Sequence, residues 1–209
     1  QHLLQSIIKD KKLEAKAVYG FFKAQSHSEE VKLFEDQTYF YFPRQLMDKG
    51  SQPNFSLADY ISPTGDDHIG LFAVTAGHGI ENIIKEYQAK NDDYTEIMAK
   101  VLADRLAEAA AEWLHKKVRT EYWGYSKDED LDLNAMLYEK YCGIRPAPGY
   151  PACPDHKEKD KIWKLLNVEE QIGISLTESR AMFPAASVCG WYFSHPKARY
   201  FSVLKNEVL

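Results

Sequence analysis

Residues 92–123, DDYTEIMAKVLADRLAEAAAEWLHKKVRTEYW, form the longest stretch with helical periodicity in this sequence. Apolar side chains recur every three or four residues, which places them on one face of a helix. These residues are Met98, Leu102, Leu106, Ala109 and Trp113. Polar side chains occupy another face: Asp104, Glu108, Glu112 and His115. The pattern predicts one unusually long amphipathic helix near the middle of the chain.

Patterns typical of strands lie on both sides of this helix. They predict strands at residues 17–22, 31–34, 38–42, 69–74, 187–193 and 200–204, with a hairpin turn at residues 35–36. Shorter helices are predicted at residues 3–13 and 157–167. Because strands cluster at the two ends of the chain and do not alternate with helices, the sequence favours an α+β fold. We expect a central twisted antiparallel sheet, with long helices packed on it, in a single domain covering residues 1–209.

The composition is that of a globular protein without a basic surface. Hydrophobic residues make up 44% of the 209 residues, and the formal net charge is −5. A negative net charge gives no general attraction to nucleic acid or to an anionic membrane, so neither is an expected partner. No apolar run reaches the roughly 20 residues that span a bilayer.

The three cysteines, Cys142, Cys153 and Cys189, are widely spaced and lack CxxC pairing. They are interpreted as reduced thiols of a cytoplasmic protein. Cys153 and His156 suggest a metal pair, but two ligands do not make a zinc site, and we expect no metal site. The sequence begins at Gln1 without an initiator methionine, so we expect a fragment of a longer, multidomain chain.

A proline-rich segment, GIRPAPGYPACP, occupies residues 143–154. Its four prolines fix φ and exclude helix and central strand, so a rigid extended loop is predicted. Backbone groups outside any ladder can read the edge of a planar ligand such as adenine. Arg145 can grip a carboxylate through two parallel hydrogen bonds, and Tyr150 offers a flat ring and a hydroxyl. Taken alone, these residues also fit a stiff surface connection in which Arg145 forms a weak ion pair.

The segment RPAPGYPACPDH, residues 145–156, resembles the loop that carries the Arg-x-x-x-Gly-Tyr motif of S-adenosylmethionine (AdoMet) binding in cobalamin-dependent methionine synthases. Five further segments resemble the same family in the same order. They are LADYISP (57–63), IGLFAVTAGHG (69–79), LADRLAEAAAEWLH (102–115), YWGY (122–125) and LTESRAMFPAASVCGWYFSHP (176–196). The resemblance covers nearly the whole chain, which is similar to the C-terminal activation domain of that family.

The resemblance implies binding roles for residues of the proline-rich loop. Arg145 would hold the methionine carboxylate of AdoMet. The backbone of Ala147, Gly149 and Tyr150 would contact the adenosine. No catalytic residue is implied, because the domain would contribute the position of the methyl group and not acid–base chemistry.

Three more ligand contacts are implied outside this loop. Tyr200 and Phe201, in the last predicted strand, match the aromatic pair beside the ligand. Glu108, on the long helix, matches an acidic residue near the ammonium or sulfonium group. Glu108 also fits a solvated acidic face, since Asp104 and Glu112 lie one turn away on either side.

The function implied is the reactivation of a methyltransferase. In this family AdoMet donates its methyl group to an oxidised cobalamin on a neighbouring domain, and an electron comes from a flavodoxin-type donor. We expect this chain to bind AdoMet, to contact the cobalamin and to dock a flavodoxin or equivalent reductase. We expect the isolated chain not to synthesise methionine. Family members begin this domain with a Trp-x-Pro-Phe-Phe-like segment and an aspartate that helps bind the amino group of AdoMet, and that segment is absent here.

Two alternative functions remain open from the residues alone. A doubly wound AdoMet methyltransferase would use the strand at residues 69–74 and the glycine turn at 77–79, but no acidic residue ends a following strand. A docking module would bind a cobalamin domain or a flavodoxin without any small ligand. Titration with AdoMet separates the docking module from the other two.

Overall fold

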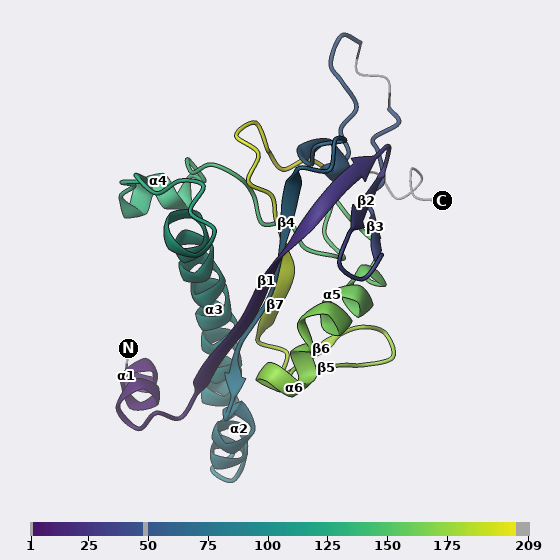
Figure 1. Cartoon of the computed structure of the whole chain (residues 1–209). Coiled ribbons are helices and arrows are strands. Elements are labelled where there is room, and N and C mark those ends of the chain that lie inside the picture. The colour runs from purple at the N-terminus through teal and green to yellow at the C-terminus, as the bar shows by residue number, and fades with distance from the viewer. Residues whose placement is uncertain (1, 48–49, 204–209) are drawn as a thin grey trace. The chain divides into compact units, whose positions relative to one another are not determined.

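The computed structural model describes residues 2–47 and 50–203. Five strands form one antiparallel sheet in the order β3-β2-β1-β4-β7 (Figure 1). Their bounds are β1 (Glu14–His27), β2 (Glu30–Leu33), β3 (Tyr39–Tyr41), β4 (Asp67–His78) and β7 (Ser187–Tyr192). The antiparallel sheet and its helices confirm the predicted α+β class.

The predicted hairpin is formed by β2 and β3. The two strands pair antiparallel, with Val31 opposite Phe40. Both of these side chains are fully buried. Asp36 closes the turn, because its carboxylate accepts from the backbone N–H of Thr38 at 3.0 Å. The turn therefore lies where the sequence places it.

The chain divides into two compact units that are interleaved along the sequence. The first unit contains residues 1–18, 73–114 and 167–188. The second unit contains residues 19–72, 115–166 and 189–209. Strands β1, β4 and β7 each begin in one unit and end in the other.

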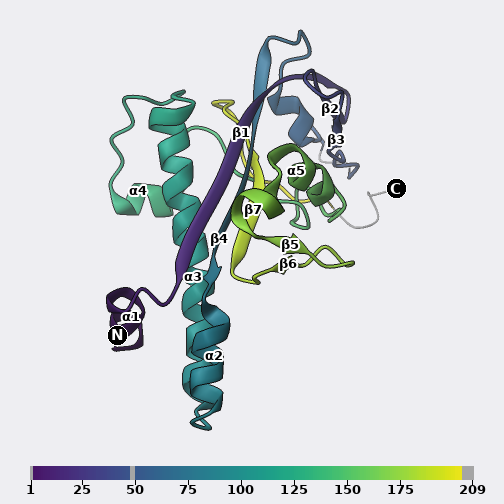
Figure 2. The same cartoon turned by 60° about the horizontal axis from the view of Figure 1, so that its bottom comes forward.

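The first unit contains four of the α-helices. They are α1 (His2–Lys9), α2 (Ile80–Gln88), α3 (Asp93–Lys117, which leaves the unit after residue 114) and α6 (Val168–Ile172). A small hairpin of β5 (Ser175–Leu176) and β6 (Met182–Phe183) follows α6 (Figure 2). α1 ends at Lys9, four residues before the predicted end, and Lys11 after it has a positive φ of 49°.

The buried face of α3 differs from the predicted one. Its buried apolar residues are Ala99, Ala103, Ala107, Ala111 and Leu114. Ala103 and Ala107 cluster with Ala76 of β4 and with Ala186. Trp113, predicted on the apolar face, is 57% exposed. The prediction was right for Leu102 and Leu106, which are partly buried against the same clusters, and wrong for Ala109 and Trp113, which are exposed. The centre of the buried face is lined by alanine, because this small side chain lets the helix approach the strand closely.

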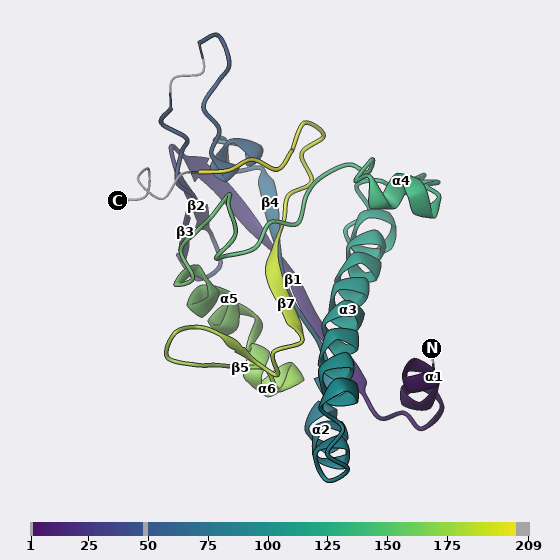
Figure 3. The same cartoon turned by 180° about the vertical axis from the view of Figure 1, so that it is seen from behind.

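The second unit contains an aromatic core. Trp191 of β7 meets Phe40 and Phe42 edge to face, with ring centroids 5.6 and 5.0 Å apart. The helices of this unit are η1 (Leu57–Tyr60), η2 (Val118–Tyr122), α4 (Leu133–Leu137) and α5 (Glu158–Leu166). Helix α5 lies beside β3 (Figure 3). No helix within the described residues is long and apolar enough to cross a membrane.

The end of the long helix and the last predicted strand also differ from the sequence-based expectation. The α-helical part of residues 92–123 ends at Lys117, and a π-helix, η2 (Val118–Tyr122), continues it. The predicted strand at residues 200–204 is wrong, because residues 200–203 have no regular secondary structure. Leu204 lies outside the described residues.

Candidate functional site

The proline-rich loop is anchored to β7 by backbone hydrogen bonds. Ile144 and Phe193 exchange two N–H to O bonds, each 3.0 Å long. Further along, the N–H of Trp191 donates to the carbonyl of Pro146 at 3.0 Å. The approach is so close that a Cβ atom on Gly190 would overlap the Pro146 carbonyl. Gly190 therefore allows the loop to lie against β7, and the prolines of the loop make it stiff.

The turn at residues 147–153 satisfies part of its own backbone. The N–H of Gly149 donates to the Cys153 carbonyl at 2.8 Å, and that of Tyr150 donates to the Ala147 carbonyl at 3.3 Å. Gly149 has a φ of 88°, a conformation that L side chains rarely adopt. A Cβ there would also overlap the ring of His156. These two N–H groups already donate hydrogen bonds within the turn. A ligand would therefore contact Gly149 and Tyr150 through their carbonyls, their Cα atoms and the exposed tyrosine ring.

Arg145 is the charged group of the loop, and three side chains hold it. Its backbone N–H donates to the hydroxyl of Tyr200 at 3.1 Å. Its guanidinium Nη1 donates to the hydroxyl of Tyr141 at 3.0 Å and lies 3.3 Å from Nδ1 of His115. The structure thus brings together Arg145 and Tyr200, two residues that are 55 positions apart.

The segment that contains Tyr200 and Phe201 runs beside the loop. The N–H of Val203 donates to the carbonyl of Pro151 at 2.7 Å. Tyr200 is 41% exposed, whereas Phe201 is half-buried and its ring centroid lies 5.9 Å from that of Phe55. Of the predicted aromatic pair, Tyr200 therefore offers the more accessible ring.

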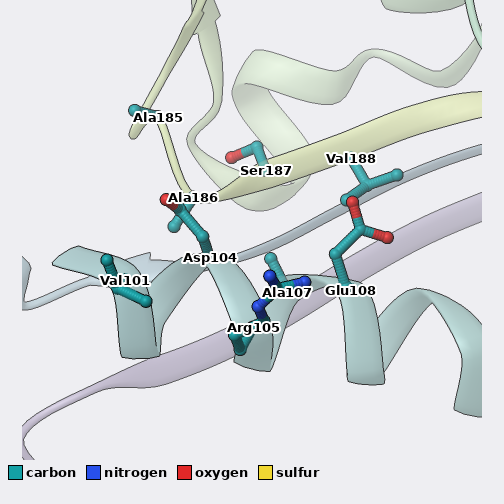
Figure 4. A pocket seen from close by; sticks show the side chains of 9 residues that line it. All are labelled: Val101, Asp104, Arg105, Ala107, Glu108, Ala185, Ala186, Ser187 and Val188. Atoms are coloured by element: carbon teal, nitrogen blue, oxygen red, sulfur yellow. The ribbon is translucent and has the colours of Figure 1, made fainter. Parts of the chain in front are cut away.

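Glu108 belongs to the first unit and lies on α3. Its side chain is exposed and lines a pocket of about 510 Å³, in which it extends toward Val188 (Figure 4). The remaining lining residues are Val101, Asp104, Arg105, Ala107, Ala185, Ala186 and Ser187. The carboxylates of Asp104 and Glu108 make this pocket suitable for a cationic group, with Arg105 between them as a partial counter-charge.

Sequence reasoning missed a group of buried polar residues behind Arg145. Arg119 of η2 is fully buried and forms a bidentate ion pair with Glu129. Its Nε donates to Oε2 of Glu129 at 2.7 Å, and its Nη2 donates to Oε1 at 2.8 Å. Its guanidinium also lies 3.9 Å from the ring centroid of Tyr141. His115, assigned to a polar face of the helix, is fully buried as well. The one available signal was the clustering of His, Arg and Tyr at the end of the long helix.

The three cysteines are free and are not paired in disulfides. Burial raises the pKa of Cys153 above its ordinary value and that of Cys189 to about 12. Among the described residues no group of three or more His, Cys, Asp or Glu side chains is placed to hold a metal ion. Cys153 has a structural role in the loop, because its backbone carbonyl and its backbone N–H both form hydrogen bonds within the loop.

Two comparisons relate the sequence and the fold of this chain to known proteins. A family model described as "Vitamin B12 dependent methionine synthase, activation domain" matches residues 1–207. A solved structure described as the crystal structure of the MetH reactivation domain bound to AdoHcy superimposes with a TM-score of 0.92 and 44% sequence identity. The match covers 96% of this chain, which spans 65% of the length of that chain.

Proposed function

Because the chain belongs to the activation-domain family of vitamin B12-dependent methionine synthase, we propose that it binds AdoMet and presents the methyl group for the reductive methylation of cobalamin. The observation that carries this proposal is the guanidinium of Arg145, which Tyr141 and His115 hold in place while the hydroxyl of Tyr200 accepts from the backbone N–H of the same residue. The superimposed MetH reactivation domain is bound to AdoHcy, which has the same carboxylate and adenosine as AdoMet.

AdoMet has three parts that a site must recognise: an α-amino carboxylate, a sulfonium cation and an adenosine. Arg145 matches the carboxylate, because the guanidinium fork fits two carboxylate oxygens. Ala147, Gly149 and Tyr150 would line the adenosine, and Tyr200 and Phe201 would supply the aromatic surface. The role of Glu108 near the ammonium or sulfonium group stays a prediction from the family resemblance.

The chain would contribute the position of the methyl donor and not a proton or a nucleophile. Another domain of a longer enzyme would hold the cobalamin, which would supply the acceptor of the methyl group when bound. The residues of this chain would hold the carboxylate and the adenosine still, so that the methyl group is oriented before transfer. We further propose that a flavodoxin or equivalent reductase docks on this protein, in the cytoplasm, to deliver the electron.

Equilibrium titration of AdoMet and AdoHcy into the chain tests this proposal. The wild-type chain should bind both, and Arg145→Ala should weaken binding by about 10- to 100-fold, the range for hydrogen bonds to charged groups. Arg145→Lys should fall between them, because a point charge replaces the planar fork. Arg180→Ala is the matched control, since Arg180 lies in the turn between β5 and β6, in the other unit.

The outcomes also separate the alternative functions. Equal affinity of wild type and Arg145→Ala would contradict a site on this loop. No binding by the wild type would support a docking module without a small ligand. A doubly wound methyltransferase is already disfavoured, because such enzymes have a mostly parallel sheet and this sheet is antiparallel.

A further inference from the structure

The imidazole of His115 lies at the end of α3, between Arg145 and Tyr125. Nδ1 lies 3.3 Å from Nη1 of Arg145, and Nε2 lies 3.3 Å from the hydroxyl of Tyr125. The side chain has no exposed surface, so it is not a ligand contact itself. We propose that His115 is a positioning residue: as a neutral imidazole protonated on Nε2, it orients the Arg145 guanidinium for the carboxylate of AdoMet. This inference rests on the proposed function.

The direction of the two hydrogen bonds determines which nitrogen carries the proton. A guanidinium has only donors, so Nδ1 of His115 must accept from Arg145. The proton is then on Nε2, which donates to the Tyr125 hydroxyl. Tyr141 accepts from the same Nη1 at 3.0 Å. Two acceptors on one guanidinium nitrogen fix both the position and the plane of the Arg145 side chain.

The aromatic surroundings hold the imidazole ring itself. Tyr192 of β7 stacks on it with ring centroids 5.1 Å apart and an interplanar angle of 19°. Tyr141 meets it edge-on, at 5.0 Å and 80°. Burial raises the pKa of Tyr125, so its hydroxyl stays protonated and neutral. His115 therefore has a single orientation, and this orientation is passed on to Arg145.

The charges that surround His115 keep it neutral. Burial is the largest cause that lowers its pKa well below the ordinary value, followed by the positive charges of Arg119 and Arg145. Glu129 pairs with Arg119 through both carboxylate oxygens. Protonation of His115 would place a third cation in this group and would remove the acceptor for Arg145. The neutral form is the one that can do the positioning.

The ligand itself offers a way to separate positioning from general structural support. AdoHcy carries the α-amino carboxylate, whereas 5′-methylthioadenosine has the same nucleoside and no carboxylate. A residue that acts through Arg145 should affect only the first ligand. A residue that merely supports the fold should affect both ligands alike.

The test compares two substitutions at one position. His115→Phe keeps a flat ring against Tyr192 but removes the acceptor, whereas His115→Asn offers an amide oxygen near the place of Nδ1. His115→Phe should raise the Kd of AdoHcy by roughly tenfold and that of 5′-methylthioadenosine by less than about twofold. His115→Asn should restore AdoHcy affinity to within about threefold of wild type. In Arg145→Ala, the added His115→Phe change should cost nothing further, because the two residues act as one unit.

Several results would overturn the inference. Equal losses for both ligands in His115→Phe would mean structural support alone, and an unchanged AdoHcy affinity would mean no role. If the wild-type chain binds AdoHcy, such results overturn only the role of His115. If the wild-type chain does not bind AdoHcy, the proposed function fails first, and the inference fails with it.

A second measurement does not depend on the stability of any variant. The ¹⁵N spectrum of the wild-type chain at pH 7, with the His115 ring identified by sequential assignment, should show this imidazole neutral and protonated on Nε2. A protonated imidazolium, or a neutral ring with its proton on Nδ1, would overturn the inference, because neither can accept a hydrogen bond from Arg145.

Discussion

At the scale of single residues, the candidate site depends on side chains that support Arg145. Arg145 carries the charge that is proposed to bind the carboxylate, and Tyr141 and His115 hold its guanidinium. Tyr200 holds its backbone. Loss of one supporting group in a buried site leaves a polar partner unsatisfied, which is costly in free energy. Substitutions behind Arg145 should therefore affect binding as well as stability.

His115 makes the free energy of unfolding depend on pH. Burial and the charges of Arg119 and Arg145 lower its pKa well below the ordinary value of 6.5. Between the lowered pKa and 6.5, the unfolded chain binds more protons than the folded chain. Stability should therefore fall as the pH falls through this window. The melting temperature of wild type should drop more between about pH 7.5 and 5.5 than that of His115→Asn, and equal drops would contradict the assignment.

Motif resemblance identified Arg145, Gly149, Tyr150 and Tyr200 as candidates, and the structure brings Arg145 and Tyr200 together. It could not identify the burial of His115. Helical periodicity places a residue on a face, but whether this face is dry depends on distant segments that cover it. Here those segments contain Tyr125, Arg145 and Tyr192. The sequence around His115 does not indicate that these residues pack against it.

At the scale of elements, the end of α3 is the feature that builds the site. The helix changes to a π-helix at Val118, and the change carries Arg119 into the interior. π-helical turns occur frequently at functional sites. Arg119 is then matched by Glu129, whose side chain is only 5% exposed. This ion pair fixes the segment from which Tyr125 reaches His115.

Glu129→Gln should destabilise the chain strongly. Removal of one partner from a buried ion pair leaves an uncompensated charge and typically costs about 3–5 kcal/mol. The exposed pair of Lys117 and Glu121, in the same stretch of chain, provides the matched control. Glu121→Gln should cost less than about 1 kcal/mol. Denaturant unfolding measures both changes, and similar values for the two variants would contradict the buried role of Glu129.

Ala107→Leu should destabilise the first unit, whereas Ala109→Leu should not. Ala107 is buried against Ala76 and Ala186, so a larger side chain would overpack this contact at a cost of about 1–3 kcal/mol. Ala109 is exposed, and a change there should stay within about 0.5 kcal/mol. Thermal unfolding of both variants would distinguish this face from the predicted one. Greater destabilisation by the Ala109 variant would show that the large apolar residues face inward after all.

The long helix itself was predictable, because its period persists over many residues. The rotation of its buried face and its π-helical end were not. Alanine is equally compatible with a buried or an exposed position, so periodicity in Ala99, Ala103 and Ala107 carries little weight without the strand they contact. The last strand was predicted wrongly for a similar reason. The aromatic residues Tyr200 and Phe201 favour strands in general, but here Tyr200 accepts a hydrogen bond from Arg145 and Phe201 packs against Phe55.

At the scale of the whole molecule, the chain consists of two interleaved units, with Arg145 and its supporting residues in the second and Glu108 in the first. Neither unit is a continuous piece of chain, so neither should fold from one segment. Strands β1, β4 and β7 cross between them. Antiparallel organisation was predictable from the clustering of strands, whereas the division into units depends on long-range contacts.

The isolated chain should form no methionine from homocysteine, with or without AdoMet. Its proposed contribution is a held methyl donor, and the cobalamin and the homocysteine would be bound elsewhere in a longer enzyme. An assay for methionine by mass spectrometry, with a full-length cobalamin-dependent methionine synthase as positive control, tests this expectation. Turnover that depends on homocysteine would contradict the proposed division of labour.

The central claim is that Arg145 and its loop form the AdoMet site, and a crystal structure of this chain with AdoHcy tests it most directly. We predict that the ligand carboxylate lies within hydrogen-bond distance of the Arg145 guanidinium, with the nucleoside against residues 147–150 and Tyr200. The guanidinium should keep its contacts with Tyr141 and His115. A ligand bound elsewhere, or a carboxylate turned away from Arg145, would contradict the account.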